Sequence, residues 1–180
     1  MNASDDKKLA ERAARGDKRA FEAIVERYEK VVYNAAYRIA KDPDDAADIT
    51  QSAFIKAYRK IDTYDPSYKL FSWLYRIATN EAINVVKRSS RMVFVDDDLG
   101  TSRQSPADDV ACVESSDQIQ QALMQLNIDL RVVVVLKYFL QLSYAEISEV
   151  AGIPEKTVKS RLFTARQRLR NVLIEQGYRP

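Results

Sequence analysis

The 180-residue chain contains no histidine and a single cysteine, Cys112. Without an imidazole it cannot build a Ser-His-Asp or Cys-His catalytic triad, or most catalytic zinc sites. One thiol cannot form an internal disulfide or a multi-thiolate metal centre, so a reducing, cytoplasmic setting is expected. Cys112 lies in an acidic stretch with no nearby cation to stabilise its thiolate, so an incidental thiol is favoured over a redox sensor.

Backbone breakers and long apolar runs are also scarce. The chain has 4 glycines and 5 prolines, which favours helices over a turn-rich sheet protein. Its longest apolar run, residues 132–136, is far shorter than the roughly 20 residues that cross a bilayer. The first eight residues are polar and charged, unlike a secretory signal. These features predict an all-α cytoplasmic protein without a metal or cofactor.

The net charge changes sign along the chain. Residues 1–90 hold 17 basic and 14 acidic side chains, residues 91–116 hold 2 and 6, and residues 117–180 hold 9 and 6. The middle segment also lacks helical periodicity, and like charge with low hydrophobicity opposes packing. We therefore predict two small helical domains, residues 1–90 and 115–180, joined by a flexible acidic linker, residues 91–114.

The first block has helical patterns throughout. Asp17 is placed to cap a helix, and Asp42-Pro43 can end that helix and start the next. A polar interruption at residues 62–67 precedes a further helix at about residues 71–87. In the second block, residues 130–140 are ambiguous, because four consecutive valines favour a strand. We predict a helix there, since a lone strand would have no partner.

The clearest local motif lies between residues 142 and 170. Ser143 and Glu146 have the spacing of a capping box, Gly152 is placed for a left-handed helix stop, and Pro154 can open another helix. This order predicts a helix-turn-helix. Residues 155–170 hold six basic side chains and one acid, so the second helix fits the major groove of DNA. The alternative is an ordinary solvated basic helix.

Aromatic residues are concentrated in the segment 58–76. It holds six of the 17 aromatic side chains, interleaved with four cations. Such a pattern suits unpaired nucleic acid, because rings stack on bases while cations hold the backbone. The alternative is that most of these rings form core, the usual fate of an aromatic at helical spacing. Tyr64 and Tyr68, in the polar interruption, fit the core alternative least.

At these residues the chain resembles the bacterial extracytoplasmic-function (ECF) sigma factors of the sigma-70 family. The matching stretches are residues 44–58 (DDAADITQSAFIKAY), 71–80 (FSWLYRIATN), 142–147 (LSYAEI), 152–154 (GIP) and 157–162 (TVKSRL). The resemblance implies a factor, not itself an enzyme, that binds core RNA polymerase and directs promoter-specific initiation. Its implied partners are the β′ clamp helices and β flap of the polymerase, promoter DNA, and an anti-sigma factor, often membrane-anchored in the family.

The resemblance also assigns site residues. Contacts to core polymerase are implied for Asp48, Gln51, Phe54 and Ile55. Recognition and melting of the −10 element are implied for Tyr64, Tyr68, Lys69, Trp73, Arg76 and Asn80. Reading of the −35 element is implied for Lys156, Lys159, Ser160, Arg161, Phe163, Thr164 and Arg166. The chain departs from the family pattern at Ser52, Thr79, Asn127, Gln141 and Thr164.

Two other classes remain as alternatives at this point. A conventional regulator would combine a helix-turn-helix with an unrelated sensing or dimerisation domain, and the motifs at residues 48–58 and 73–80 disfavour it. A hydrolase or phosphatase would need carboxylate pairs such as Asp44/Asp48 or those at residues 96–98. These acids fit a capped helix start and a solvated linker better.

Overall fold

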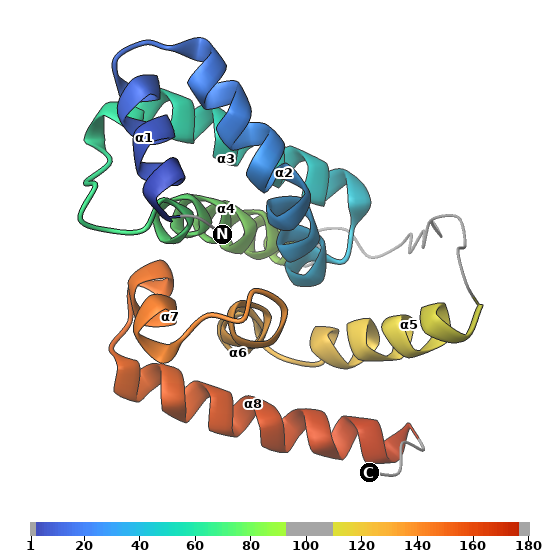
Figure 1. Ribbon diagram of the computed structural model, residues 1–180. Helices are drawn as coiled ribbons and strands as arrows, with labels where there is room; N and C mark the ends of the chain where they lie inside the picture. Colours follow the sequence, from blue (N-terminus) through green and yellow to red (C-terminus); the bar gives the residue numbers. More distant parts are fainter. Residues whose placement is uncertain (1–2, 93–109, 177–180) are drawn as a thin grey trace.

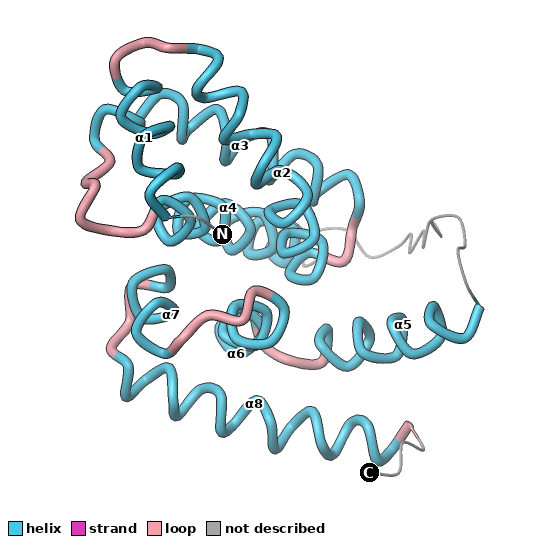
Figure 2. Tube along the Cα trace, in the orientation of Figure 1, coloured by secondary structure: helices cyan, strands magenta, loops and turns pink. Residues whose placement is uncertain are grey.

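The computed structural model describes residues 3–92 and 110–176, which form helices joined by loops, with no strand among them (Figures 1 and 2). The bounds of the α-helices are α1 Ala3–Ala14, α2 Lys18–Ala40, α3 Pro43–Lys60, α4 Leu70–Met92, α5 Val110–Met124, α6 Ile128–Val134, α7 Tyr144–Ala151 and α8 Glu155–Glu175. A short 3-10 turn, η1 (Ile61–Thr63), follows α3, and a π-helical turn, η2 (Val135–Phe139), follows α6. The all-α prediction is confirmed.

Helices α1–α4 form one layer around a core of large apolar side chains. The core residues that are almost wholly buried include Tyr28, Val32, Ile39, Ile49, Leu70 and Leu74. Asp17 caps α2 by accepting a hydrogen bond from the Ala20 amide at 3.2 Å, and Asp42 caps α3 by accepting from the Asp45 amide at 2.8 Å. Pro43 occupies the first turn of α3. The helix starts predicted at Asp17 and Asp42 are therefore confirmed.

One buried carboxylate fixes α1 to α2. Asp6 is 4% exposed and accepts a hydrogen bond from the Tyr28 hydroxyl at 2.6 Å, while Arg27 forms an ion pair with it. Burial, and then the Asp6 carboxylate, raise the pKa of Tyr28 well above its ordinary value. No local sequence pattern marks Asp6 as a buried residue.

Helices α5–α8 form the second layer, with α8 along its outer side (Figure 1). The buried side chains include Leu123, Leu126, Val133, Leu136, Ile147 and Leu162. The valine run is helical, as predicted: residues 128–134 form α6 and the chain then widens into η2. In this setting the valines are buried against neighbouring helices, and packing outweighs their preference for strands.

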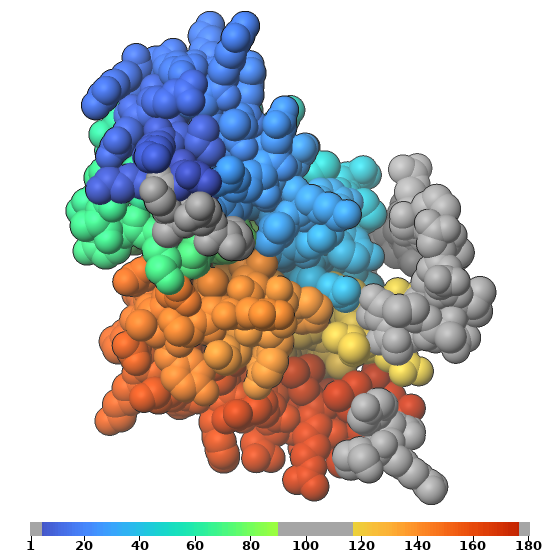
Figure 3. Space-filling model, in the orientation of Figure 1, coloured from blue at the N-terminus to red at the C-terminus, as the bar shows by residue number. Residues whose placement is uncertain are grey.

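The two layers pack directly against each other (Figure 3). Helix α7 lies against α4, and α2 contacts α5, α6 and η2. Helix α4 continues to Met92 and α5 begins at Val110. The predicted linker falls mainly on residues 93–109, outside the described residues, and its flexibility and the role of Cys112 stay predictions.

Candidate polymerase and nucleic-acid interfaces

The exposed side of α3 carries the residues that the sequence assigns to polymerase contact. Gln51, Phe54 and Ile55 line a groove of about 600 Å³ between α2 and α3. Ile55 is 46% exposed, a large value for an isoleucine, whereas Phe54 is mostly buried and forms the groove floor. Asp48 is exposed on α3 one turn before Gln51 but does not line the groove. The structure therefore brings three of the four residues together.

In the loop between η1 and α4, contacts with neighbouring residues hold the ring of Tyr64 in place. The Tyr64 hydroxyl donates to the backbone carbonyl of Tyr68 at 2.6 Å, and the Tyr64 ring lies 5.6 Å from Trp73 between centroids. Burial raises the pKa of the Tyr64 hydroxyl. Tyr68 is 55% exposed, so its ring faces solvent where a base could stack. Tyr75, by contrast, is buried core, as the alternative reading of this segment expected.

Helix α4 continues this surface. Trp73, Arg76 and Asn80 are spaced by three and four residues, which places them on one face of the helix. Arg76 and Asn80 are exposed and Trp73 is half-buried. Thr79, one of the departures from the family pattern, is only 4% exposed. A buried hydroxyl therefore lies beside the predicted −10 surface.

The predicted helix-turn-helix is present as α7, a turn and α8. The Ser143 hydroxyl accepts from the Glu146 amide at 3.2 Å, and the Glu146 carboxylate accepts from the Ser143 amide at 2.8 Å, which completes the capping box. Gly152 ends α7 with φ of 65°. This left-handed conformation favours glycine, which lacks a Cβ.

The outer face of α8 is basic and polar. Lys156, Lys159, Ser160, Phe163, Thr164 and Arg166 are exposed there, and Phe163 is 59% exposed. Arg161 departs from this set, because it is only partly exposed and pairs with Asp129 of α6 at 3.6 Å. Val158, Leu162 and Ala165 are buried, as the helical spacing predicted. The structure thus groups six of the seven predicted −35 residues.

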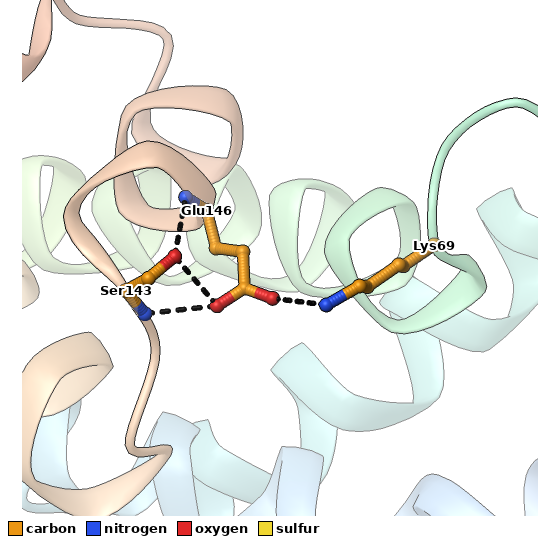
Figure 4. A network of polar contacts seen from close by, with 3 residues as sticks. All are labelled: Lys69, Ser143 and Glu146. Carbon is orange, nitrogen blue, oxygen red and sulfur yellow. Dashed lines mark hydrogen bonds and ion pairs between the residues drawn. The ribbon is translucent and has the colours of Figure 1, made fainter. Parts of the chain in front are cut away.

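Glu146 links the two predicted DNA surfaces. Its second carboxylate oxygen accepts from Nζ of Lys69 at 2.6 Å (Figure 4). Lys69, followed by the Ser143 amide, lowers the pKa of the Glu146 carboxyl to about 2. Because Lys69 belongs to the predicted −10 surface, one of its cations is neutralised by the other domain.

An apolar groove of about 530 Å³ lies between α5, η2 and α8 and was not predicted from the sequence. Its exposed apolar side chains are Ile119, Tyr138, Phe139 and Ile174, each at least 39% exposed, and Arg166 and Arg170 also line it. In the sequence, the adjacent apolar pairs 138–139 and 173–174 could indicate this groove, but such pairs are equally typical of buried core residues. The packing of the helices is needed to tell the two apart.

Within residues 3–92 and 110–176, no group of three or more acidic or cysteine side chains is placed to hold a metal ion. None of the helices in these ranges is long and apolar enough to cross a membrane.

Comparisons with known proteins agree with this arrangement. Residues 24–92 match Sigma-70 region 2, and residues 116–169 match Sigma-70, region 4. The chain is 37% identical over 179 residues to the ECF RNA polymerase sigma factor SigW of Bacillus subtilis, covering 93% of this chain and 96% of the relative. It is 35% identical over 185 residues to the RNA polymerase sigma-H factor of Pseudomonas aeruginosa, covering 96% of each.

Comparison of the fold with solved structures also points to a sigma factor. The structure of CnrH in complex with the cytosolic domain of CnrY superposes with a TM-score of 0.75 at 26% identity, covering 95% of this chain and 98% of CnrH. The molecule is a two-part helical transcription factor of the sigma-70 type. The chain belongs to the ECF sigma factors of that family, which direct promoter-specific transcription initiation by RNA polymerase. The resemblance in the sequence is confirmed, and the family assignment replaces the conventional-regulator alternative.

Proposed function

We propose that α1–α4 bind core RNA polymerase and the −10 element, that α5–α8 bind the −35 element, and that residues 91–114 join the two. The division at residues 1–90 and 115–180 is supported by the two helical layers and by the separate region 2 and region 4 matches. In this proposal the chain works in the cytoplasm and catalyses no reaction itself. Its side chains bind, orient and open DNA.

The observation that carries the polymerase role is the α2–α3 groove. It combines the exposed apolar Ile55 with the polar Gln51, an arrangement suited to a helical partner that buries an apolar stripe. We assign this groove, together with Asp48, to the β′ clamp helices. The apolar groove beside α8 is assigned to the β flap, with Arg166 and Arg170 at its rim.

The −10 role is supported by the exposed ring of Tyr68 beside Lys69, Arg76 and Asn80. Rings and cations together can hold melted bases against restacking. The −35 role is supported by the exposed face of α8, where Lys159 and Ser160 follow the helix start and can reach the major groove. A tether between the modules raises the avidity for the paired elements through effective concentration.

An anti-sigma partner belongs to the proposal as well. CnrH was solved with the cytosolic domain of CnrY, and the sigma factor RpoE of Bartonella quintana with the anti-sigma factor NepR. We propose that such a protein, in some cases membrane-anchored, covers the two grooves of this chain and thereby competes with core polymerase.

The experiment is co-elution of the full chain with bacterial core RNA polymerase on size exclusion. A one-to-one complex is expected for the wild type, with weaker complexes for Asp48→Ala and Gln51→Ala. Asp117→Ala and Gln167→Ala are matched controls, because both are exposed residues of the same types in α5 and α8. Absence of a complex with folded, monodisperse protein would contradict the proposal.

A further inference from the structure

Helix α1 is docked by a carboxylate more than by apolar packing. Among residues 5–14, the buried side chains are those of Asp6 and two alanines, and an alanine removes little apolar area from water. Asp6 accepts a hydrogen bond from the Tyr28 hydroxyl at 2.6 Å and pairs with Arg27, and both partners belong to α2. A buried carboxylate is costly without such partners, so these contacts hold α1 in one position on α2.

The same helix supports the predicted −10 loop. Helix α1 lies against η1, the turn that leads into that loop (Figure 1). Tyr64 follows η1 directly, its hydroxyl donates to the Tyr68 carbonyl at 2.6 Å, and its ring packs on Trp73. Burial, and then the Asp6 carboxylate, raise the pKa of Tyr64, which places Asp6 within electrostatic reach of that hydroxyl.

A series of aromatic rings connects the Asp6 site to the start of α4. The Tyr28 ring lies edge-on to the Tyr75 ring at 6.4 Å between centroids, and the Tyr75 ring lies 5.8 Å from that of Phe71. Tyr28 and Tyr75 are 0% and 5% exposed, so a shift of either ring displaces its neighbour. Phe71 is in the first turn of α4, two residues before Trp73. The hydroxyl that Asp6 holds thus belongs to a ring that packs towards the −10 surface.

We propose that Asp6 is a positioning residue of the −10 surface. By docking α1 on α2, it holds η1 and the Tyr64–Trp73 pair in the arrangement that presents the Tyr68 ring to an unpaired base. Asp6 acts through these residues and not by touching DNA, since it is only 4% exposed. Helix α1 lies outside residues 24–92, which match region 2, so the family match assigns it no role. The proposal rests on the proposed role of Tyr68 in −10 recognition.

Four variants test this role. Asp6→Ala removes the carboxylate and deprives both the Tyr28 hydroxyl and Arg27 of this partner. Asp6→Asn is the conservative variant, because its amide oxygen can still accept from Tyr28 while the charge is lost. Tyr28→Phe removes the hydrogen bond from the other side. Asp5→Ala is the matched control, since Asp5 is an exposed aspartate of the same helix.

The first measurement is acrylamide quenching of Trp73, the single tryptophan of the chain, in the free full-length protein. It is made at a temperature at which circular dichroism shows the variants to be folded. We expect stronger quenching in Asp6→Ala and Tyr28→Phe, because the half-buried ring loses its fixed contact with Tyr64, and near-wild-type quenching in Asp6→Asn and Asp5→Ala. If Asp6→Ala and Tyr28→Phe are quenched no more than Asp5→Ala, the proposal is wrong. Should Asp6→Ala fail to fold, Tyr28→Phe decides.

The second measurement is strand binding by the chain assembled on core RNA polymerase. The probe is a fluorescein-labelled 12-nucleotide single strand, selected by the wild-type assembly from a randomised pool and followed by anisotropy, with core polymerase alone as background. We expect Asp6→Ala to weaken binding about fivefold, the effect of losing one weak base–ring stack. Asp6→Asn should lose less and Asp5→Ala nothing. Co-elution with core polymerase, which depends on the α2–α3 groove in the proposed function, should not change.

A double-mutant cycle with Tyr68→Ala separates this proposal from the proposed function. If Tyr68→Ala leaves strand binding unchanged, the −10 role of Tyr68 fails and the positioning role fails with it. If Tyr68→Ala weakens binding but Asp6→Ala matches Asp5→Ala, Asp6 is only structural and the −10 role stands. In the Tyr68→Ala background, Asp6→Ala is expected to have little further effect. Additive losses would overturn the proposal, because Asp6 would then act through another part of the surface.

Discussion

The guanidinium group of Arg131 donates a hydrogen bond from Nη1 to the backbone carbonyl of Ile39, 92 residues earlier in the chain, at 2.5 Å. The same side chain donates to the carbonyls of Leu123, Met124 and Leu126 at 3.0–3.2 Å. The Arg131 guanidinium thus supplies hydrogen-bond donors to backbone carbonyls near the C-terminal ends of both α5 and α2. Burial lowers the pKa of Arg131, and its charge is balanced by carbonyl dipoles.

Arg131→Met is expected to lower the free energy of unfolding by about 2–3 kcal/mol. The substitution keeps an unbranched apolar stem but leaves several buried carbonyls without donors. Urea denaturation measures the loss. Arg168→Met serves as the control because Arg168 is exposed on α8, and equal losses for the two variants would contradict the structural role of Arg131.

Lys159→Ala is expected to weaken binding to a duplex selected by the chain from a randomised pool. It should also reduce the slope of log affinity against log salt by about 0.9 if one phosphate contact is lost. Arg168→Ala is the control: it lies nine residues away, which at 3.6 residues per turn is the opposite side of α8. An unchanged slope for Lys159→Ala would mean that a different face of α8 meets DNA.

Asn80→Ala is expected to leave core polymerase binding unchanged and to slow promoter opening. Asn80 is exposed on α4, so removing its amide leaves no buried group unpaired. Co-elution measures polymerase binding, and fluorescence of a base analogue in the −10 region measures opening. Loss of polymerase binding would show instead that Asn80 supports the structure of α4 or its polymerase surface.

The Glu146 contribution is expected to depend on pH. Its folded-state pKa of about 2 lies below the ordinary value of 4.5, so the carboxylate stabilises the fold above pH 4.5 and loses this effect as pH falls towards 2. The unfolding free energy of the wild type should exceed that of Glu146→Gln by about 1 kcal/mol at pH 7, since Lys69 of the pair is exposed to solvent. At pH 3 less than half of this difference should remain. A difference that is constant with pH would exclude the ionised pair as its source.

Gln141→Gly is expected to stabilise the chain by about 1 kcal/mol. Gln141 has a φ of 55°, in the left-handed region that favours glycine. A side chain there costs conformational energy, which outweighs the added entropy of glycine in the unfolded chain. The midpoint of thermal unfolding measures the change. Gly152→Gln, which places a side chain at a left-handed position now held by glycine, should shift the midpoint downward.

Much of this molecule follows from local sequence. Asp17, Asp42 and the Ser143–Glu146 pair determine where helices begin, because each satisfies amide groups within three residues of itself. Gly152 indicates the turn of the helix-turn-helix, because a glycine readily adopts the left-handed conformation that ends a helix. The buried positions Val158, Leu162 and Ala165 follow from helical spacing. The valine run is an exception, because its local preference is for a strand and burial among the neighbouring helices makes it helical.

The relationship between the domains was decided only by the tertiary structure. The sequence around Glu146 predicts only a capping residue. No nearby residue indicates its contact with Lys69, which lies 77 residues earlier in the chain. Arg131 and Gln120 likewise find their acceptors at the end of α2, and Arg161 turns from the DNA face to Asp129 because α6 lies beside α8. Local motifs identify helices and their faces because their partners are a few residues away. Contacts between distant segments depend on how those faces pack, which no short-range pattern records.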